Sequence, residues 1–329
     1  MPKRSLDWNL DLLVDLMVNN ATVVLSGTRM ASQLGVPPST LWEWVQHLRE
    51  IGVQVRGLQG SGYQLQTIPD ILTARSLRHA LGSCEFGSHI HHLYKTDSTM
   101  NDAGRLAAAG AAHGTLVIAE EQTAGRGRLG HTWFSERQVG LYFTLILRPP
   151  LAPSAAPILT LMTGVALAEA LQENSGVVMD LRWPNDVLCN AKKCAGILVE
   201  MTAEPEKVEH VLIGIGINVN HESIPAELAS EATSLRLEAG KHFSRIEVLS
   251  AVLKRLERYY HLLLLEGTDA IVRRFAEISS FATGKRVTVS DGVHTLAGTT
   301  AGLTSEGILT VRRDDGQIEK VLSGHVRPA

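Results

Sequence analysis

The residues best suited to chemistry form a glycine-rich loop that carries two arginines, Gly125-Arg126-Gly127-Arg128-Leu129-Gly130. The loop follows an apolar run at residues 115–119 that predicts a β-strand. Glycine has no Cβ, so its backbone can adopt positive φ angles and approach a ligand closely. Guanidinium groups bind carboxylate and phosphate oxygens through paired hydrogen bonds. The pattern predicts an anion site. The alternative, a surface loop with solvated arginines, gives no reason for so many glycines.

The same loop satisfies the Gly-x-Gly-x-x-Gly pattern of dinucleotide-binding folds. That interpretation requires a helix directly after the glycines, with its N-terminus facing a pyrophosphate. Residues 131–140 have no helical period and lead into another strand, and no acidic residue ends a strand about 20 residues further on. The context therefore argues against an oxidoreductase.

Two downstream segments add further cations beside apolar strands. One is Arg182-Trp183-Pro184-Asn185-Asp186, in which we expect Trp183 to pack in the core and Asn185 and Asp186 to brace the turn. In the other, Lys193 begins an apolar strand, and Asn218 ends the next one, so both can face the same region. Lys192 is expected to be an ordinary surface lysine of a hairpin.

The elements that must position these residues predict an α+β central domain. Helices are expected near residues 73–81, 101–109, 155–172 and 245–265, and strands at residues 90–94, 115–120, 140–147, 179–182, 195–201 and 208–218. The connection at residues 190–192 is too short for anything but a hairpin, so the sheet is expected to be largely antiparallel.

The N-terminal residues 1–66 predict a winged helix-turn-helix. Apolar residues at helical spacing give helices at residues 8–17 and 27–34, and Ser39 is expected to cap a third helix that ends at Glu50. Strands at residues 53–56 and 62–65 flank a glycine turn and form the wing. Asp7, Asp11 and Asp15 are expected to form a solvated face of the first helix. Of Trp42 and Trp44, at least one should be buried.

The chain divides into three predicted domains at residues 1–66, 67–280 and 281–329. In the last, short strands alternate with turns at residues 291–292, 305–307 and 315–316, which indicates a small β-barrel. The 329 residues are 44% hydrophobic and carry a net charge of −3, which excludes a globally basic nucleic-acid binder.

The cysteines and histidines also indicate the cellular compartment of the protein and whether it binds a metal. Cys84, Cys189 and Cys194 form no Cys-x-x-Cys pair, so we expect reduced thiols in a cytoplasmic protein and no structural zinc. His89, His91 and His92 lack a carboxylate or cysteine at ligand spacing, so solvated or packing roles are expected and no metal site. We find no signal peptide, and no apolar run near the ~18 residues of a membrane span.

Taken together, several segments resemble the biotin protein ligases in their order and approximate spacing. They are Asp97-Ser98-Thr99, the glycine loop, Arg182–Asp186, Lys193–Glu200 and Gly214–Asn218. The resemblance implies a mixed, mostly antiparallel ligase domain followed by an SH3-like barrel. It implies that biotin and ATP, with Mg²⁺, give biotinoyl-5′-AMP, from which biotin passes to a lysine of a biotin carboxyl carrier protein.

The resemblance also implies residue roles. It assigns biotin to Ser98, Thr99, Met100, Gln122, Gly125 and Gly127, together with Arg126, Arg128 and Arg182. It assigns catalysis to those three arginines, and ATP or the adenylate to Arg128, Lys193 and Asn218. Arg182 departs from the family, which usually has a lysine there that bridges the biotin carboxylate and the α-phosphate. Arginine keeps the charge but replaces a compact ammonium with a planar fork.

Family members with such an N-terminal domain also repress the biotin operon, as homodimers formed on binding the adenylate. Candidate base contacts here are Ser39, Thr40, Glu43 and Gln46, with Arg29 and Arg56 available for phosphates. Within residues 1–69 five basic residues balance five acidic ones, so DNA binding should be weak. The alternatives are a ligase whose N-terminal domain is only structural, and a lipoate ligase.

Overall fold

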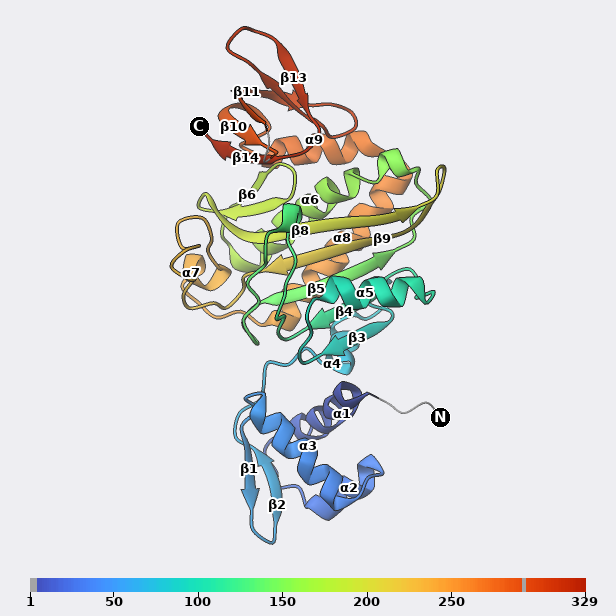
Figure 1. The fold of residues 1–329 in the computed structure, drawn as a ribbon. Helices are drawn as coiled ribbons and strands as arrows, with labels where there is room; N and C mark the ends of the chain where they lie inside the picture. Colours follow the sequence, from blue (N-terminus) through green and yellow to red (C-terminus); the bar gives the residue numbers. More distant parts are fainter. Residues whose placement is uncertain (1–4, 292–293) are drawn as a thin grey trace.

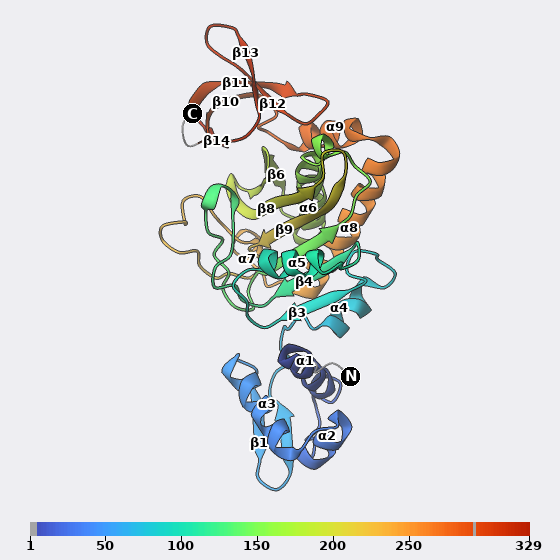
Figure 2. The same ribbon diagram turned by 45° about the vertical axis from the view of Figure 1, so that its right-hand side comes forward.

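A computed structural model describes residues 5–291 and 294–329. Its regions follow one another along the long axis of the molecule, as Figures 1 and 2 show. Three helices and a hairpin lie at one end, a large sheet with its helices lies in the middle, and a small sheet lies at the other end. Lys3 and Arg4, which entered the charge balance, lie outside the described residues.

The N-terminal module contains α1 (Leu6–Val18), α2 (Gly27–Leu34), α3 (Pro38–Glu50) and the antiparallel strands β1 (Val55–Leu58) and β2 (Gly62–Leu65). Trp44 is buried and Trp42 is 56% exposed, which confirms the prediction for this pair. The prediction that Ser39 caps α3 was wrong, because the helix already begins at Pro38. Proline suits the first helical turn, where an N–H would have no partner within the helix.

The prediction of a solvated aspartate face on α1 was also wrong. Asp11 and Asp15 are buried, because this face packs against the start of α4 (Ala74–Leu81). Asp11 Oδ2 accepts a hydrogen bond from the Ala74 backbone N–H at 3.2 Å, and Asp15 Oδ1 accepts one from Thr73 Oγ1 at 2.9 Å. Carboxylates are favourable at a helix N-terminus.

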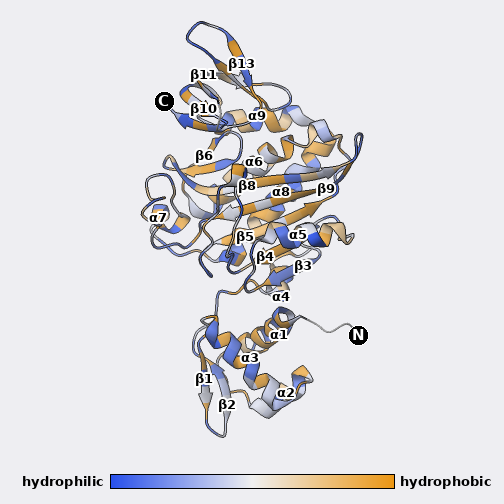
Figure 3. Cartoon of the chain, in the orientation of Figure 1, coloured by the Kyte–Doolittle hydropathy of each residue, from blue (hydrophilic) through white to orange (hydrophobic). Residues whose placement is uncertain are grey.

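The central sheet has the order β3-β4-β5-β9-β8-β7-β6. Its strands are β3 (Ile90–Leu93), β4 (Thr115–Ala119), β5 (Leu141–Leu147), β6 (Met179–Arg182), β7 (Asp186–Cys189), β8 (Lys192–Ala203) and β9 (Val208–Ile217). Only β3 and β4 pair in parallel, so the mostly antiparallel prediction is confirmed. Apolar residues run along β5, β8 and β9 (Figure 3).

Helices cover the two faces of this sheet unequally. On one face pack α6 (Ile158–Ser175) and α8 (Arg245–Glu266), and on the other α5 (Thr99–Ala108) packs mainly against β4, β5 and β9. The far part of β8 and β9 is therefore left open beside α5. Short helical segments lie at Arg128–Gly130, Pro153–Ala155 and α7 (Leu235–Ala239).

Helix α6 corrects the expectation about apolar runs. Counted as Pro153–Ser175, it is long and apolar enough to cross a membrane by length and composition, and 72% of the tested window is buried inside the protein. Its apolar surface packs against the sheet and α8, as a core helix does.

The C-terminal β-module follows α9 (Thr268–Ile278), a helix that the sequence did not predict. It contains β10 (Thr283–Ser290), β11 (Thr295–Leu303), β12 (Leu309–Arg312), β13 (Ile318–Val321) and β14 (His325–Pro328), all paired antiparallel. Val287, Val311 and Val326 belong to the same hydrophobic cluster as the central helices. This shared core holds β14 against the central region.

Candidate active site

The predicted residues line two adjoining cavities on the α5 side of the sheet. The first, of about 40 Å³, is lined by Ser98, Thr99, Met100, Gln122, Arg126, Gly127 and Arg128, among others. The second, of about 200 Å³, is lined by Arg128, Arg182, Lys193 and Asn218, among others. Arg128, Lys193 and Trp133 line both. Segments far apart in the sequence therefore form one continuous site.

One end of the first cavity is a cluster of neutral polar groups. The Thr99 N–H and Oγ1 donate to Gln122 Oε1 at 2.9 and 3.1 Å, and Gln122 Nε2 donates to Ser135 Oγ at 2.8 Å. These bonds fix the orientation of the Gln122 amide. Ser98, which precedes α5, is buried, and its Oγ has no hydrogen-bond partner in the described part of the chain.

The floor of the first cavity is made of glycines on two paired strands. Gly196 on β8 lies opposite Gly216 on β9, and Gly214 also lines the cavity. A Cβ on Gly216 would lie 2.3 Å from Trp133 Cε2, and one on Gly214 would lie 2.6 Å from Met100 Sδ. The missing side chains give Trp133 and Met100 room to lie directly on the sheet.

Two glycines of the loop lie so close to neighbouring atoms that a side chain would crowd them. A Cβ on Gly125 would lie 2.4 Å from the Trp133 carbonyl oxygen and 3.0 Å from Gln122 Nε2. Gly127 is similarly close to the His131 carbonyl oxygen, at 3.1 Å. Positive φ angles occur instead at Leu129 and Gly130. Gly125 therefore lies beside Gln122 but does not line either cavity.

Where the cavities meet, cations surround one carboxylate. Arg182 donates to Asp186 Oδ2 through Nε at 3.1 Å and an NH2 group at 2.7 Å, and Lys193 Nζ lies 2.6 Å from Oδ1. Burial raises the pKa of Asp186, but Lys193 and Arg182 outweigh burial and hold it below its usual value. Burial lowers the pKa of Arg128, whose guanidinium donates to Asn185 Oδ1 at 2.9 Å. Asn185 and Asp186 thus support the site's cations.

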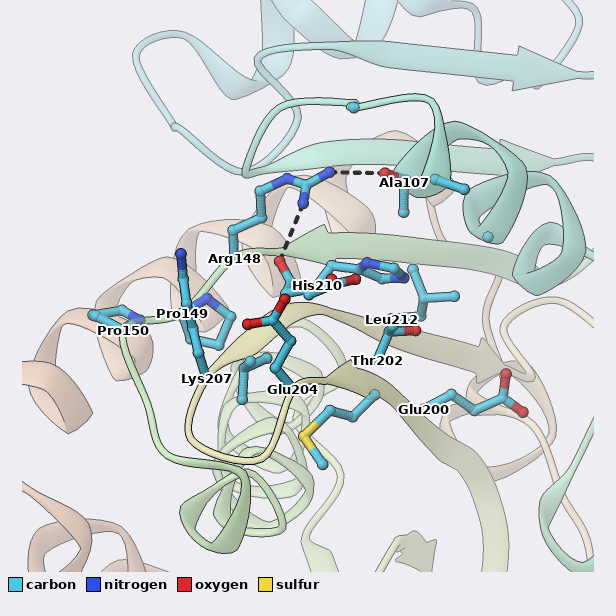
Figure 4. Close-up of a pocket in the computed structure, with 16 residues that line it drawn as sticks. Ala107, Arg148, Pro149, Pro150, Glu200, Thr202, Glu204, Lys207, His210 and Leu212 are labelled. Carbon is cyan, nitrogen blue, oxygen red and sulfur yellow. Dashed lines mark hydrogen bonds between the residues drawn. The ribbon is translucent and has the colours of Figure 1, made fainter.

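Arg126 occupies the rim rather than the junction. It is ion-paired with Glu200 and donates to Asn101 Oδ1 at 3.2 Å. Beyond Glu200 lies an open groove of about 1320 Å³ between α5 and the β8–β9 hairpin (Figure 4). The groove is lined by both basic and acidic side chains, including Arg148, Lys207 and Glu204, and it is continuous with the rim of the first cavity through Glu200.

The second cavity also has apolar lining residues, Phe134, Ile224, Pro225 and Leu228, which we call its apolar wall. Asn218 is buried at the end of β9, where its Nδ2 donates to the Thr233 carbonyl oxygen at 2.9 Å. Asp186 and Glu231 are the carboxylates among the lining residues, and both are ion-paired, Glu231 with Arg327 at 2.6 Å.

Unpartnered buried polar atoms gather at this site. In the described residues, such atoms include Ser98 Oγ, Trp133 Nε1 and His325 Nε2, and all three residues line one of the two cavities. Native proteins rarely leave buried polar groups without a partner, so each exception needs an explanation. A ligand with matching polar groups would satisfy these atoms.

Several site residues were not predicted from the sequence. Trp133 lies in the irregular connection after the glycine loop, and His131, His325 and Arg327 line the second cavity. Only the alternation of Gly214 and Gly216 within a strand could have signalled the close approach of Trp133. No local pattern links His325, near the C-terminus, to the loop at residues 125–130.

The remaining predictions concern the histidines and cysteines. His92 is buried and ion-paired with Asp11 at 2.8 Å and Glu120 at 3.2 Å, whereas a solvated or packing role had been expected. The sequence could not show this pairing, because both partners come from other elements. Cys189 and Cys194 are buried free thiols, as expected. In the described residues, no group of three or more His, Cys, Asp and Glu side chains is arranged so that it could hold a metal ion.

Comparisons with known proteins agree on one family. Residues 93–218 match the model of the biotin/lipoate A/B protein ligase family. The bifunctional ligase/repressor BirA of Bacillus subtilis (strain 168) is 34% identical over 317 residues, covering 95% of this chain and 97% of that protein. BirA of Escherichia coli (strain K12) is 29% identical over 305 residues, covering 92% of each.

A solved structure shows the same similarity. The biotin protein ligase from Aquifex aeolicus in complex with biotin and ATP has a TM-score of 0.64 and 32% identity, covering 74% of this chain and 100% of that one. The stretch that matches the family model runs from the end of β3 to just after β9. It contains all the residues that the sequence predicted for the small-molecule site.

Proposed function

This chain belongs to the biotin protein ligase family, and on that premise we propose that it joins biotin to a lysine of a biotin carboxyl carrier protein in two steps driven by ATP. The observation that carries the proposal is the convergence of unpartnered buried atoms and cations on two joined cavities. The BirA relatives carry both activities in their name, ligase and repressor, and the site of this chain supports the ligase.

The polar and apolar groups that line the first cavity match those of biotin. Ser98, Thr99 and Gln122 offer donors and acceptors for a ureido ring, and Met100 and the glycine floor suit the apolar ring and chain. Trp133 lies over the glycine floor and Arg126 lies at the rim, so these two side chains bound the space that biotin would occupy.

In the first step the biotin carboxylate attacks the α-phosphate of ATP, so two anions must come together. We assign Arg128, Arg182 and Lys193 to hold them at the junction of the cavities, with Arg126 closing over the carboxylate from the rim. Positioned cations stabilise the charge that develops on the transferred oxygens, and no covalent enzyme nucleophile is required. Asn218 and the apolar wall suit the adenosine.

Mg²⁺ enters this reaction with ATP. Asp186 and Glu231, the carboxylates that line the second cavity in the described residues, are both occupied by cations. Because both carboxylates already face cations, we assign neither of them as a resident magnesium ligand. We expect the phosphates and water to coordinate the ion.

The open groove beside the first cavity suits the approach of the acceptor. Glu200, which lines the groove shown in Figure 4, is ion-paired with Arg126 at the rim of the first cavity, so a lysine presented from this side would approach the adenylate from the rim. We therefore propose that the carrier protein docks along the β8–β9 hairpin and α5.

We further propose that residues 1–66 form a winged helix that binds operator DNA, that residues 67–280 form the ligase domain, and that residues 281–329 form an SH3-like barrel. The exposed residues Ser39, Trp42 and Glu43 on α3, beside the β1–β2 hairpin, support the DNA-binding role. Dimerisation on adenylate binding and a cytoplasmic location belong to the same proposal. A ligase with a structural N-terminal domain is the alternative.

One assay tests the ligase proposal. The purified protein is incubated with ATP, Mg²⁺, a carboxyl carrier domain and radiolabelled biotin or lipoate, and both pyrophosphate release and carrier labelling are measured. We expect both signals with biotin. Labelling with lipoate but not with biotin would overturn the substrate assignment.

A further inference from the structure

Two histidines from opposite ends of the fold meet at the wall of the second cavity. His131 follows the short helical turn of the glycine loop, and His325 begins β14 of the C-terminal β-module. Their ring centroids lie 5.1 Å apart, with the planes at 82°, and both residues line the cavity. The C-terminal β-module thus supplies part of the site.

His325 has an unused hydrogen-bonding atom at this position. Its Nε2 is buried and has no partner among the described residues. Burial lowers the pKa of His325, as do the neighbouring His131, Arg128 and Arg327, against the opposing effect of Asp186. The imidazole is therefore neutral at neutral pH and can donate one hydrogen bond and accept another. An unpaired buried donor is unfavourable and is relieved by a ligand acceptor.

The other walls of the cavity fix which part of ATP lies here. The reacting α-phosphate must lie at the junction with the first cavity, where Arg182 and Lys193 are. The adenine suits the apolar wall of Ile224, Pro225 and Leu228. The remaining lining residues include His131, His325 and Arg327, the last ion-paired with Glu231 at 2.6 Å, and they adjoin Arg128, so hydrogen-bond donors and cations outnumber carboxylates here.

We propose that His325, together with His131, binds the β- and γ-phosphates of ATP, the part that leaves during adenylation. This inference rests on the proposed ligase function. A biotin carboxylate oxygen forms a bond to the α-phosphorus, the bond from that phosphorus to the α–β bridging oxygen breaks, and pyrophosphate leaves with the electron pair. Hydrogen bonds from the histidines to pyrophosphate oxygens stabilise that developing charge.

The two half-reactions separate this role from a structural one. Biotinoyl-5′-AMP contains no β- or γ-phosphate, so its transfer to the carrier protein does not use the histidine wall. A change at His325 should impair adenylation from ATP and spare transfer from added biotinoyl-5′-AMP. A general loosening of the C-terminal β-module would impair both.

The test uses full-length His325→Leu, which keeps volume and removes the donor, and His325→Gln, which restores an amide N–H at similar reach. The control is His294→Gln, a histidine of the same β-module whose side chain is 86% exposed. We expect His325→Leu to raise the KM for ATP or lower the adenylation rate by roughly ten- to a hundredfold, the range for a hydrogen bond to a charged group. His325→Gln should recover part of this, and transfer from added biotinoyl-5′-AMP should be unchanged.

Three results would overturn the proposal: unchanged adenylation kinetics in His325→Leu, equal losses in both half-reactions, or the same loss in His294→Gln. Coupling between His131 and His325 is tested with the double leucine variant, whose loss should be smaller than the product of the single losses. If the unmodified protein forms no biotinoyl-5′-AMP but accepts another acid, the ligase assignment fails first, and the two failures can be told apart.

Discussion

At the scale of single residues, the site depends on one carboxylate that organises two cations. Asp186 holds the Arg182 guanidinium group and the Lys193 ammonium group together at the junction of the cavities. Arg182 is only 7% exposed, so its position is set by this ion pair and by the end of β6. The arginine in place of the family's lysine is therefore a built-in part of the site and not a solvated substitute.

The first prediction concerns Arg182. Arg182→Ala should lower the adenylation rate on the order of 10²-fold or more, the scale seen when one positioned electrostatic group is removed. Arg182→Lys should keep or raise the rate, because the ammonium can still reach Asp186 and the reacting anions. Initial rates of biotin-dependent pyrophosphate release measure both. Unchanged adenylation in Arg182→Ala would remove this residue from the mechanism.

At the scale of elements, β8 and β9 have two roles: one face belongs to the hydrophobic core, and the other forms the floor of the first cavity. Their far face packs under α6, while Gly196, Gly214 and Gly216 open the near face to the ligand. The strands tolerate these glycines because both are interior strands of the sheet, with neighbours on each side.

The second prediction follows from that floor. Gly216→Ala should weaken biotin binding by roughly tenfold or more, the scale of adding a methyl group to a filled site, because the new Cβ forces the Trp133 indole into the cavity. Isothermal titration with biotin measures the effect. Gly104→Ala on α5 is the control, since its Cβ would meet only Leu212 Cδ1 at 3.8 Å. Equal affinity in both variants would contradict the glycine-floor assignment.

The sequence predicted the elements better than the contacts between them. Hydrophobic period located the predicted helices and strands to within three residues of their ends, because it reports which face of each element is buried. It misjudged Asp11, Asp15 and His92, which are polar and buried, because their partners lie on other elements. Likewise, the motifs located most of the small-molecule site, but Trp133 and His325 reach it only through the tertiary fold.

Those polar residues form the contact between α1 and the central sheet. Asp11 of α1 pairs with His92 of β3, His92 pairs with Glu120, and Glu120 pairs with Arg245 of α8 at 2.8 Å. Burial alone would lower the pKa of His92, but the hydrogen bonds and charges of Asp11 and Glu120 raise it to about 9. His92 is therefore charged at neutral pH and holds two carboxylates from different modules.

The third prediction is a pH dependence of this contact. An unfolded histidine titrates near 6.5, so the contribution of His92 is complete below about pH 6.5 and is lost as pH rises through about 9. It amounts to on the order of 3 kcal/mol. The neighbouring Glu120, whose pKa is lowered to about 2, loses its contribution only in acid and does not affect this window.

Hydrogen exchange of α1 amides between pH 6.5 and 9.5, corrected for intrinsic exchange rates, measures the effect. Protection should fall across this range in the unmodified protein, and His92→Gln should be less protected at pH 6.5 and nearly independent of pH. The same decline in His92→Gln would show that another group is responsible.

At the scale of the whole molecule, the contact joins the N-terminal module to the ligand site. Glu120 directly follows β4 and lies two residues before Gln122, whose amide is fixed in the first cavity. On the other side of the module, Arg137 and Gln138 donate to the carbonyl oxygens of Glu50 and Ile51, at the end of α3, at 3.3 and 3.5 Å. The module is thus held at both α1 and α3, which favours a fixed orientation over a flexible tether.

This arrangement changes the charge that the module presents to DNA. Asp11 and Asp15 are buried against the central region, so they no longer offset the exposed Arg29 and Arg56. Glu43 and Glu50 remain exposed on α3. The surface around the β1–β2 hairpin and α3 is therefore less acidic than the balanced net charge suggests, but it still offers few cations.

The fourth prediction is that DNA binding is weak for one copy and becomes useful only for a dimer. Each neutralised phosphate contributes a slope of roughly −0.9 in the logarithm of affinity against the logarithm of salt concentration, so few cations give a shallow dependence. Pairing two modules raises affinity through effective concentration, without any new contact to DNA.

A mobility-shift titration on DNA upstream of the biotin-synthesis genes, with and without biotin plus ATP and at two salt concentrations, measures both properties. Binding should require biotin and ATP, and Arg56→Ala should weaken it, whereas Arg313→Ala, on the distant C-terminal β-module, should not. Tight binding without the adenylate, or a steep salt slope, would contradict the charge argument, and no binding under any of these conditions would leave residues 1–66 as a structural module that holds α1 and α3 against the ligase site.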